Sequence, residues 1–223
     1  MFDKDLINTT RTLASLVDGP PNVDHALAAV LARAAPVYTA IWWDAHRRAD
    51  EARREDLQTL VNEYGPALVK RLTAIYHADW PSEPRVVDLS AYTNWAGAYS
   101  TDGGLIEVAS TDPSGSGAVG LETLFHESSH QWDEEVQQRI ERVAASQHRR
   151  APRSLSHGLI FYTSGEIVKE VIPDHVPYAE QEGIWSRGGM RGMQPVLDEY
   201  WRPYLRGTGT IDEALANVIA HLQ

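Results

Sequence analysis

The sequence predicts a helix-rich α+β domain, and three observations carry that prediction. The chain has 223 residues, of which 43% are hydrophobic, so it can bury one substantial core as a single domain. Apolar residues recur at helical spacing in the first part of the chain. They give way to short β-branched segments, and helical spacing then returns. We therefore expect a helical part over residues 1–80, a small sheet and a helix over 81–132, and a helical lobe over 133–223.

Two amphipathic stretches make up most of the N-terminal part. The first is rich in Ala and runs to Pro36, where the missing N–H and the ring should kink or restart the helix. The second repeats apolar residues at helical spacing, among them Leu57 and Leu72. Trp42 and Trp43 lie between these stretches, and their size predicts that they anchor the core. This part of the chain is predicted to be scaffold.

Three short segments in the middle of the chain have the composition of strands. They are RVVDLS at 85–90, WAGAYS at 95–100 and LIEVAS at 105–110, and they are rich in β-branched and aromatic residues. The last two are joined by TDGG, which is typical of hairpin turns. The segments predict a small antiparallel sheet. In the loop that follows, Asp112 and Ser114 are suited to cap the next helix.

The stretch LETLFHESSHQW, residues 121–132, predicts the functional centre of the chain. As a helix, it places His126 and His130 one turn apart on one face, with Glu127 about 100° round the axis. Two neutral imidazoles at this spacing can both reach a tetrahedral zinc ion. The carboxylate between them can take a proton from a water molecule that the ion activates. The competing interpretation is a buried helix whose histidines are satisfied by hydrogen bonds.

A catalytic zinc ion normally takes three protein ligands, so one more is needed beside the two histidines. The HExxHxxGxxH continuation of the metzincins is excluded, because its Gly position holds Asp133 and its third His position holds Val136. Asp133 lies about 10 Å from His126 along a straight helix. It could therefore bind the same ion only if the helix broke there.

A second amphipathic helix, predicted over residues 156–170, offers further carboxylates. Tyr162 and Glu170 point to within about 40° of Glu166, whereas His157 lies about 180° away on the other side. Without a metal motif upstream, two glutamates at this spacing would usually form a solvated acidic face.

The pairing of HESSH with a downstream ExxxE resembles the gluzincins, the thermolysin-like branch of zinc metallopeptidases. The resemblance implies a zincin-like domain in which Glu166 is the third zinc ligand and Glu170 orients a ligand histidine, with Glu170 as the alternative ligand. It also implies that an edge strand before the metal helix, 95–100 or 105–110, binds an extended peptide through its main chain. A hairpin that only covers the core is the alternative.

The Gly- and Pro-rich connection after the second helix is long enough to be a lid or a binding loop. By the same resemblance, Tyr178 in this connection would stabilise a developing oxyanion, with Tyr162 and His157 as rival candidates. Arg187 or Arg191 could hold a substrate carboxylate. Solvated arginines on a covering loop are the simpler interpretation of both.

Composition narrows the range of partners. The formal net charge of −11 and the pI near 5.2 argue against nucleic acid or an anionic membrane surface as the main partner. The chain has no cysteine, so a metal must be held by N and O ligands. No apolar run approaches the length of a transmembrane helix, and no signal peptide is recognisable at the N-terminus. The oligomeric state stays open, as does the compartment, either the cytoplasm or, with a signal already removed, the exterior.

These features predict a zinc-dependent hydrolase with Glu127 as the general base and a peptide bond as the favoured target. The partner would be a peptide or another small hydrolysable molecule. Two alternatives stay open. The same site could act on a non-peptide ester, amide or phosphoester, or the protein could bind zinc without turnover.

Overall fold

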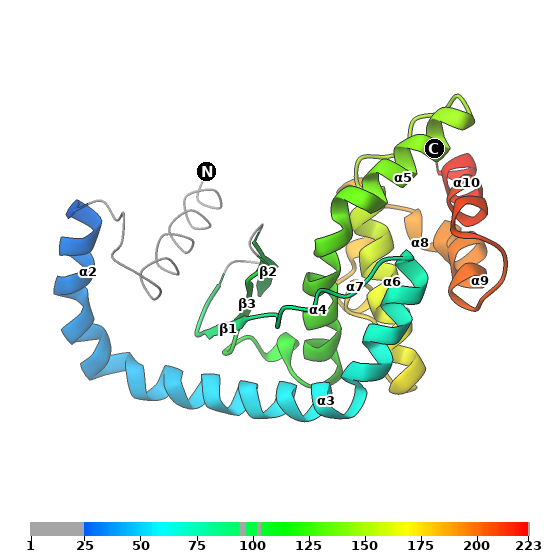
Figure 1. Ribbon diagram of the computed structural model, residues 1–223. Coiled ribbons are helices and arrows are strands. Elements are labelled where there is room, and N and C mark those ends of the chain that lie inside the picture. The colour runs from blue at the N-terminus through cyan, green and yellow to red at the C-terminus, as the bar shows by residue number, and fades with distance from the viewer. Residues whose placement is uncertain (1–24, 94–96, 102–103, 223) are drawn as a thin grey trace.

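The computed structural model describes residues 25–93, 97–101 and 104–222. Figure 1 shows a helical body formed by the C-terminal half, a small sheet beside it, and a long helical arm that runs beneath the sheet. The chain therefore has the helix-rich α+β architecture that its periodicity predicts. The predictions made for residues 1–24, and those that depend on Trp95 or on the middle of the TDGG turn, lie outside the described residues.

The arm consists of two α-helices joined by one π-helical turn. Helix α2 spans His25–Tyr38, η1 spans Thr39–Trp43 and α3 spans Asp44–Tyr76. Pro36 lies inside α2, and the regular helix gives way to the π-helical turn shortly after it. The predicted disturbance at this proline is therefore a local change in helix type.

Trp42 and Trp43 are not core anchors, so the prediction made from their size is wrong. Their exposed fractions are 48% and 43%, and η1 contains no buried residue. Both rings instead pack against Tyr38, at centroid distances of 6.4 and 6.3 Å. The physical reason is their place on the arm, where α2 and α3 are the main neighbours of η1 among the described elements.

The second half of α3 belongs to the core. Leu57, Leu68 and Leu72 are all buried, which confirms the helical spacing read from the sequence. Pro66 lies within the helix, and Figure 1 shows that α3 changes direction before its last turns. This bend brings the end of the arm against the helical body.

The sheet has three strands and is mixed, not antiparallel as predicted. Strands β1 (Val87–Ser90), β2 (Ala98–Ser100) and β3 (Ile106–Ala109) lie in the order β1-β3-β2. Strand β3 is antiparallel to β2 but parallel to β1. Successive strands alternate in direction, so β1 and β3 run the same way. Because β3 lies between β1 and β2, it is parallel to β1 and antiparallel to β2. Strand β2 is consequently an edge strand.

Helix α4 (Gly117–Ser129) carries His126 and Glu127 of the HESSH motif, and α3 holds its start in place. The N-cap is Ser116, not Asp112 or Ser114 as the sequence suggested, and its side chain makes no capping hydrogen bond. The N–H of Gly117 instead donates to Asp56 Oδ2 at 2.8 Å. This free N–H at the start of α4 is thus satisfied by a carboxylate from another helix, and sequence spacing does not reveal such a contact.

The remaining elements build the helical body around α4. They are η2 (Pro113–Gly115), η3 (His130–Trp132), α5 (Asp133–Ser146), α6 (Leu155–Val171), α7 (Tyr178–Gln181), η4 (Ile184–Ser186), η5 (Gly188–Met190), α8 (Met193–Val196), η6 (Leu197–Trp201), α9 (Arg202–Leu205) and α10 (Ile211–His221). Helix α6 packs along α4, and α10 packs on α5. Fully buried side chains between them include Leu121, Leu159 and Trp201.

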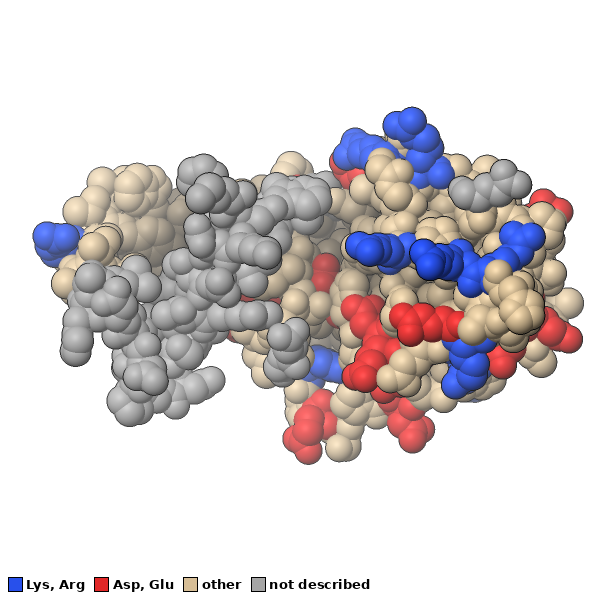
Figure 2. Space-filling view, turned by 90° about the horizontal axis from the view of Figure 1, so that it is seen from above, with Lys and Arg blue, Asp and Glu red and all other residues tan. Residues whose placement is uncertain are grey.

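Charge on the surface is mixed. On the face shown in Figure 2, Lys and Arg side chains form a band across the helical body, and Asp and Glu side chains gather beside it. None of the helices in the described chain is both long and apolar enough to cross a membrane.

Candidate metal centre

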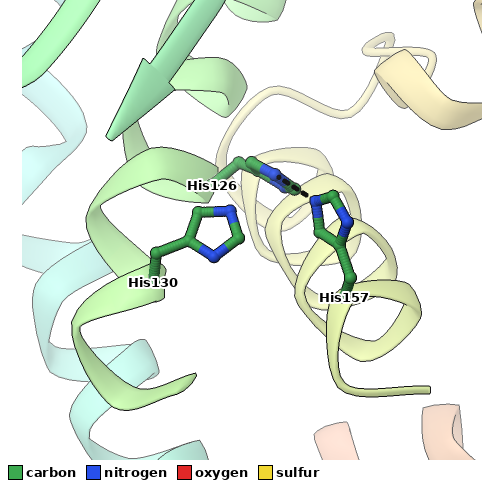
Figure 3. Close-up of side chains that lie close together, drawn as sticks. All are labelled: His126, His130 and His157. Atoms are coloured by element: carbon green, nitrogen blue, oxygen red, sulfur yellow. Dashed lines mark hydrogen bonds between the residues drawn. The ribbon is translucent and has the colours of Figure 1, made fainter. Parts of the chain in front are cut away.

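Three histidines from two facing helices meet at one point. His126 lies on α4, His130 follows directly after it, and His157 lies near the start of α6. Figure 3 shows the three rings directed toward a common space between the helices. The ring centroids are 5.0, 5.1 and 5.1 Å apart, so the group is nearly equilateral. The predicted pair on the first helix is thus completed by a histidine from the second.

The spacing of the nitrogens fits one metal ion. The Nε2 atoms of His126 and His157 are 3.2 Å apart, and one ligand atom from each of the three histidines lies within 4.8 Å of the others. Two nitrogens that bind one tetrahedral zinc ion at about 2.0–2.1 Å would stand about 3.3 Å apart. The short contact is also compatible with a hydrogen bond in which one neutral imidazole donates to the other. The metal content of the purified protein distinguishes a metal site from a hydrogen bond between the two imidazoles.

Burial favours the neutral form of two of these imidazoles, and that is the form that binds a metal. Burial lowers the pKa of His126 well below its usual value, and the neighbouring histidines lower it further. Burial likewise lowers the pKa of His157, to about 4. For His130, burial also lowers the pKa, but the hydrogen bond and the charge of Asp133 outweigh it, so the net pKa is raised.

Asp133 orients His130. Its Oδ2 lies 2.8 Å from His130 Nδ1, which leaves Nε2 to face the other two rings. The two residues are three apart, which makes them neighbours on a helix, and a 3₁₀ turn joins the end of α4 at Ser129 to the start of α5 at Asp133. The helix therefore does break at the position considered for Asp133, but the Asp133 carboxylate contacts His130 and is not one of the groups that converge with the three histidines.

The structure does not bring Glu166 to the histidines. Glu166 and His157 are nine residues apart on one straight helix, which separates them by about 13 Å along its axis. The Glu166 carboxylate instead accepts a hydrogen bond from Arg202 Nε at 3.0 Å. The same network contains Tyr162, whose hydroxyl donates to Asp198 Oδ1 at 2.6 Å. Glu166 and Tyr162 thus belong to a structural ion-pair network on the opposite face of α6.

Glu170, predicted to orient a ligand histidine, also has another role in the structure. Its two carboxylate oxygens accept from Arg71 Nε and Nη2, each at 2.7 Å. Arg71 Nη2 also donates to the carbonyl oxygen of Leu205 at 2.7 Å. Glu170 therefore ties α6 to α3 and to the C-terminal helices.

Glu127 lies beside the histidine group, where the sequence placed it. Ser100 on the edge strand β2 hydrogen-bonds its carboxylate through both its side chain and its backbone. Burial raises the pKa of Glu127, while the nearby His130 and the bonds from Ser100 act in the opposite direction. A raised pKa brings a carboxylate closer to the range in which it can both accept and return a proton near neutral pH.

The histidine group lies on the wall of a cavity of about 920 Å³. Strand β2, α4 and the connection after α6 line this cavity, and Tyr178, Ile184 and Met190 come from the connection. Phe161 stacks on the His157 ring at a centroid distance of 4.6 Å and lies parallel to the Tyr178 ring at 6.2 Å. Residues of this connection therefore form part of the cavity wall, and its role as a lid or binding loop stays a prediction.

A buried pair fixes Tyr178 relative to the metal helix. Glu122 lies one turn before His126, and its Oε2 contacts His175 Nε2 at 2.6 Å and accepts from the Tyr178 N–H at 2.8 Å. Both side chains of the pair are 2% exposed. Burial raises the pKa of Glu122, and the bonds from His175 and Tyr178 oppose that rise. Gly165 on α6 makes room for this arrangement, because a Cβ there would lie 2.6 Å from Pro177.

Of the other predicted residues, Tyr178 alone among the three oxyanion candidates lines the cavity without belonging to the histidine group. Arg187 and Arg191 are exposed and lie outside the cavity wall. Sequence reasoning missed Asp133 as the orienting carboxylate and Glu122 and His175 as a pair. Asp133 had a usable signal, since a residue three positions after a ligand histidine is within reach once the helix tightens.

Comparisons of the chain with family models, with curated proteins and with solved structures gave no match. The interpretation of the centre therefore depends on its geometry and chemistry.

Proposed function

We propose that the protein is a zinc-dependent hydrolase that cleaves peptide bonds. The observation that supports this proposal is the convergence of His126, His130 and His157 on one wall of a large cavity, with the carboxylate of Glu127 beside them. Three imidazoles leave one position of a tetrahedral ion for a water molecule or a substrate, which is the arrangement of catalytic zinc sites.

The ligand set fits zinc, although imidazoles also suit copper, iron and nickel. When bound, a zinc ion would polarise a substrate carbonyl and lower the pKa of a water molecule. Hydrolysis needs no redox chemistry and zinc supplies none, so a zinc ion is compatible with the proposed reaction.

The residues around the histidines supply the remaining steps. The Glu127 carboxylate is placed to accept a proton from a water molecule in the cavity and to deliver it to the leaving nitrogen. Ser100 holds that carboxylate in position. The Tyr178 hydroxyl is the candidate donor to a developing oxyanion, since its ring lies on the cavity wall and its backbone is fixed by Glu122.

A peptide is favoured over other substrates because an edge strand forms part of the cavity. Ala98 to Ser100 of β2 line the cavity, and β2 pairs only with β3 among the described strands. An extended peptide can add to such an edge through main-chain hydrogen bonds. The second rim suggested by the sequence, 105–110, contains β3, which is paired on both sides.

The proposal departs from the gluzincin pattern in one respect. A histidine takes the place that the resemblance gave to Glu166, and the predicted orienting role of Glu170 passes to Asp133. The proposed activity therefore depends on the site itself and not on a zincin-like ancestry.

The test combines metal content with turnover. Protein purified without added chelator should contain about one zinc ion per chain, and Glu127→Gln should keep that ion while losing turnover of a peptide library read by mass spectrometry. Gln is nearly isosteric with Glu but cannot accept a proton, so the rate should fall by about 10²- to 10⁴-fold. Glu135→Gln is the matched control, because Glu135 also lines the cavity but is exposed at its mouth.

Three results would count against the proposal. A protein that takes up no metal would leave the histidines as a hydrogen-bonded group. A full-rate Glu127→Gln enzyme would remove the general base. Turnover of esters with no cleavage of any peptide would keep the centre but change its substrate.

A further inference from the structure

One cation on the cavity wall has no carboxylate partner among the described residues. Arg85 precedes β1 and lines the same cavity as the histidines, and it is the sole Lys or Arg on that wall among the described residues. Other arginines of the body contact carboxylates: Arg71 binds Glu170, Arg139 binds Asp212 and Arg202 binds Glu166. The one described acceptor for Arg85 is the neutral side chain of Gln131, whose Oε1 lies 2.6 Å from Nη2.

The guanidinium of Arg85 therefore has unused donors. It carries five N–H groups, and one described hydrogen bond engages one of them. Its Nε is buried without a hydrogen-bond partner. A buried donor of a permanent cation that lacks an acceptor is costly, so a ligand that supplied negative charge beside it would be bound favourably.

Two neighbours hold Arg85 in place for such a ligand. Gln131 directly follows His130, and its Nε2 donates to the Ser128 carbonyl oxygen at 2.8 Å, so the amide is fixed with its oxygen toward Arg85. Gly104 gives the guanidinium room, because a Cβ at that position would lie 2.4 Å from Nη1. The cation is thus held between Gly104 of the hairpin and Gln131, and Gln131 is one residue along the chain from a proposed metal ligand.

The acidic groups on the cavity wall do not neutralise it by direct contact. Glu122, Glu127 and Asp133 are bonded to His175, Ser100 and His130, respectively. Asp79 and Glu135 are exposed, and no ion pair among the described residues joins any of these five carboxylates to Arg85. The positive charge of Arg85 is accordingly available to the contents of the cavity.

We propose that Arg85 is an anion-binding subsite that selects substrates carrying a carboxylate. A carboxylate is the anion that a peptide brings most often, as its C-terminus or as an acidic side chain, and a guanidinium binds it in planar geometry. This inference depends on the proposed metal centre, because it places the carboxylate relative to a group bound there.

Paired probes can test the subsite without turnover. The probes are aliphatic hydroxamates that end in a carboxylate, from the succinic to the suberic monohydroxamate, each with the corresponding terminal carboxamide. The hydroxamate binds zinc, and the series of lengths samples a range of separations between the metal centre and Arg85. Calorimetry on the zinc-loaded protein should show at least one length at which the carboxylate binds about 10-fold or more tightly than the carboxamide, as expected for hydrogen bonds to a charged group.

Variants assign the preference to a residue. Arg85→Gln should abolish the preference for the carboxylate and leave the affinity for the carboxamide unchanged, and Arg85→Lys should keep part of it. Arg187→Gln is the matched control, because Arg187 is an exposed arginine outside the cavity, and it should behave as wild type.

Equal binding of carboxylate and carboxamide at every length would overturn the proposal, and so would a preference that survives in Arg85→Gln; either result would make Arg85 a structural link between the hairpin and α4. If no hydroxamate binds in the presence of zinc, the metal centre fails and this subsite fails with it. Carboxamides that bind without any carboxylate preference would retain the centre and reject the subsite alone.

Discussion

Replacing His157 with Ala should remove most of the affinity for zinc. His157 supplies the one imidazole from α6, and its Nε2 lies 3.2 Å from that of His126. Apparent binding free energies at structural zinc sites with four ligands are about 10–16 kcal/mol, or about 2.5–4 kcal/mol for each ligand. At about 1.4 kcal/mol per factor of ten, the loss of one ligand predicts an affinity about 100- to 1,000-fold lower.

The assay is an equilibrium competition for zinc against a chromophoric chelator, with circular dichroism to check that each variant is folded. Glu166→Gln is the control, because it removes the carboxylate that sequence spacing favoured while leaving the histidines untouched. Its zinc affinity should match wild type. Its stability should fall by about 1 kcal/mol at most, since Arg202 keeps its contact with Asp198 at 2.5 Å. Weak binding by Glu166→Gln with normal binding by His157→Ala would refute the three-histidine assignment.

Two further predictions concern carboxylates. Asp133→Asn should weaken zinc binding by about 10- to 100-fold without unfolding the protein, because it weakens the partner of His130 Nδ1; unchanged affinity in the same competition would show that Asp133 orients nothing. Burial, and secondarily the charge of Asp88, raises the pKa of Glu107 to about 7, so the folded protein holds this proton more tightly than the unfolded chain does. Stability should therefore fall as pH rises from about 4.5 to 7, and Glu107→Gln should be the more stable protein at pH 8, with the difference shrinking at pH 5 in urea unfolding. Parallel curves at both pH values would contradict this.

Periodicity predicted the helices well because burial on one side of a helix leaves a direct record in the sequence. Leu57, Leu68 and Leu72 repeat at helical spacing and are buried. Strand pairing leaves no such record. The three strand segments were recognisable, but nothing local to β1 states whether β2 or β3 will be its neighbour, and the mixed sheet follows from that choice. Trp42 and Trp43 show the same limit, since the apolar character of a side chain does not specify which element, if any, covers that side chain.

The third residue of the centre illustrates why spacing alone could not complete the site. Helix α6 offers two polar faces, one with His157 and one with Glu166, and both alternate with buried residues. A helical pattern gives the angle between these faces but not which of them turns toward α4. In the structure, the glutamates on the carboxylate face form ion pairs with arginines of other helices: Arg202 pairs with Glu166, and Arg71 pairs with Glu170. Because arginines distant in sequence pair with both glutamates, the face of α6 that turns toward α4 is the one that carries His157.

The break at the end of α4 positions two side chains near the histidine group. Side chains at i and i+3 are neighbours on a helix, and the 3₁₀ turn at 130–132 keeps Asp133, the first residue of α5, beside His130 with its carboxylate on Nδ1. The same break lets Gln131 leave the helical pattern and present its amide oxygen to Arg85. One irregular turn therefore positions both the group that orients a ligand histidine and the group that holds the proposed anion subsite. The centre and the subsite should accordingly respond together to changes in this turn and separately to changes at His157 or Arg85.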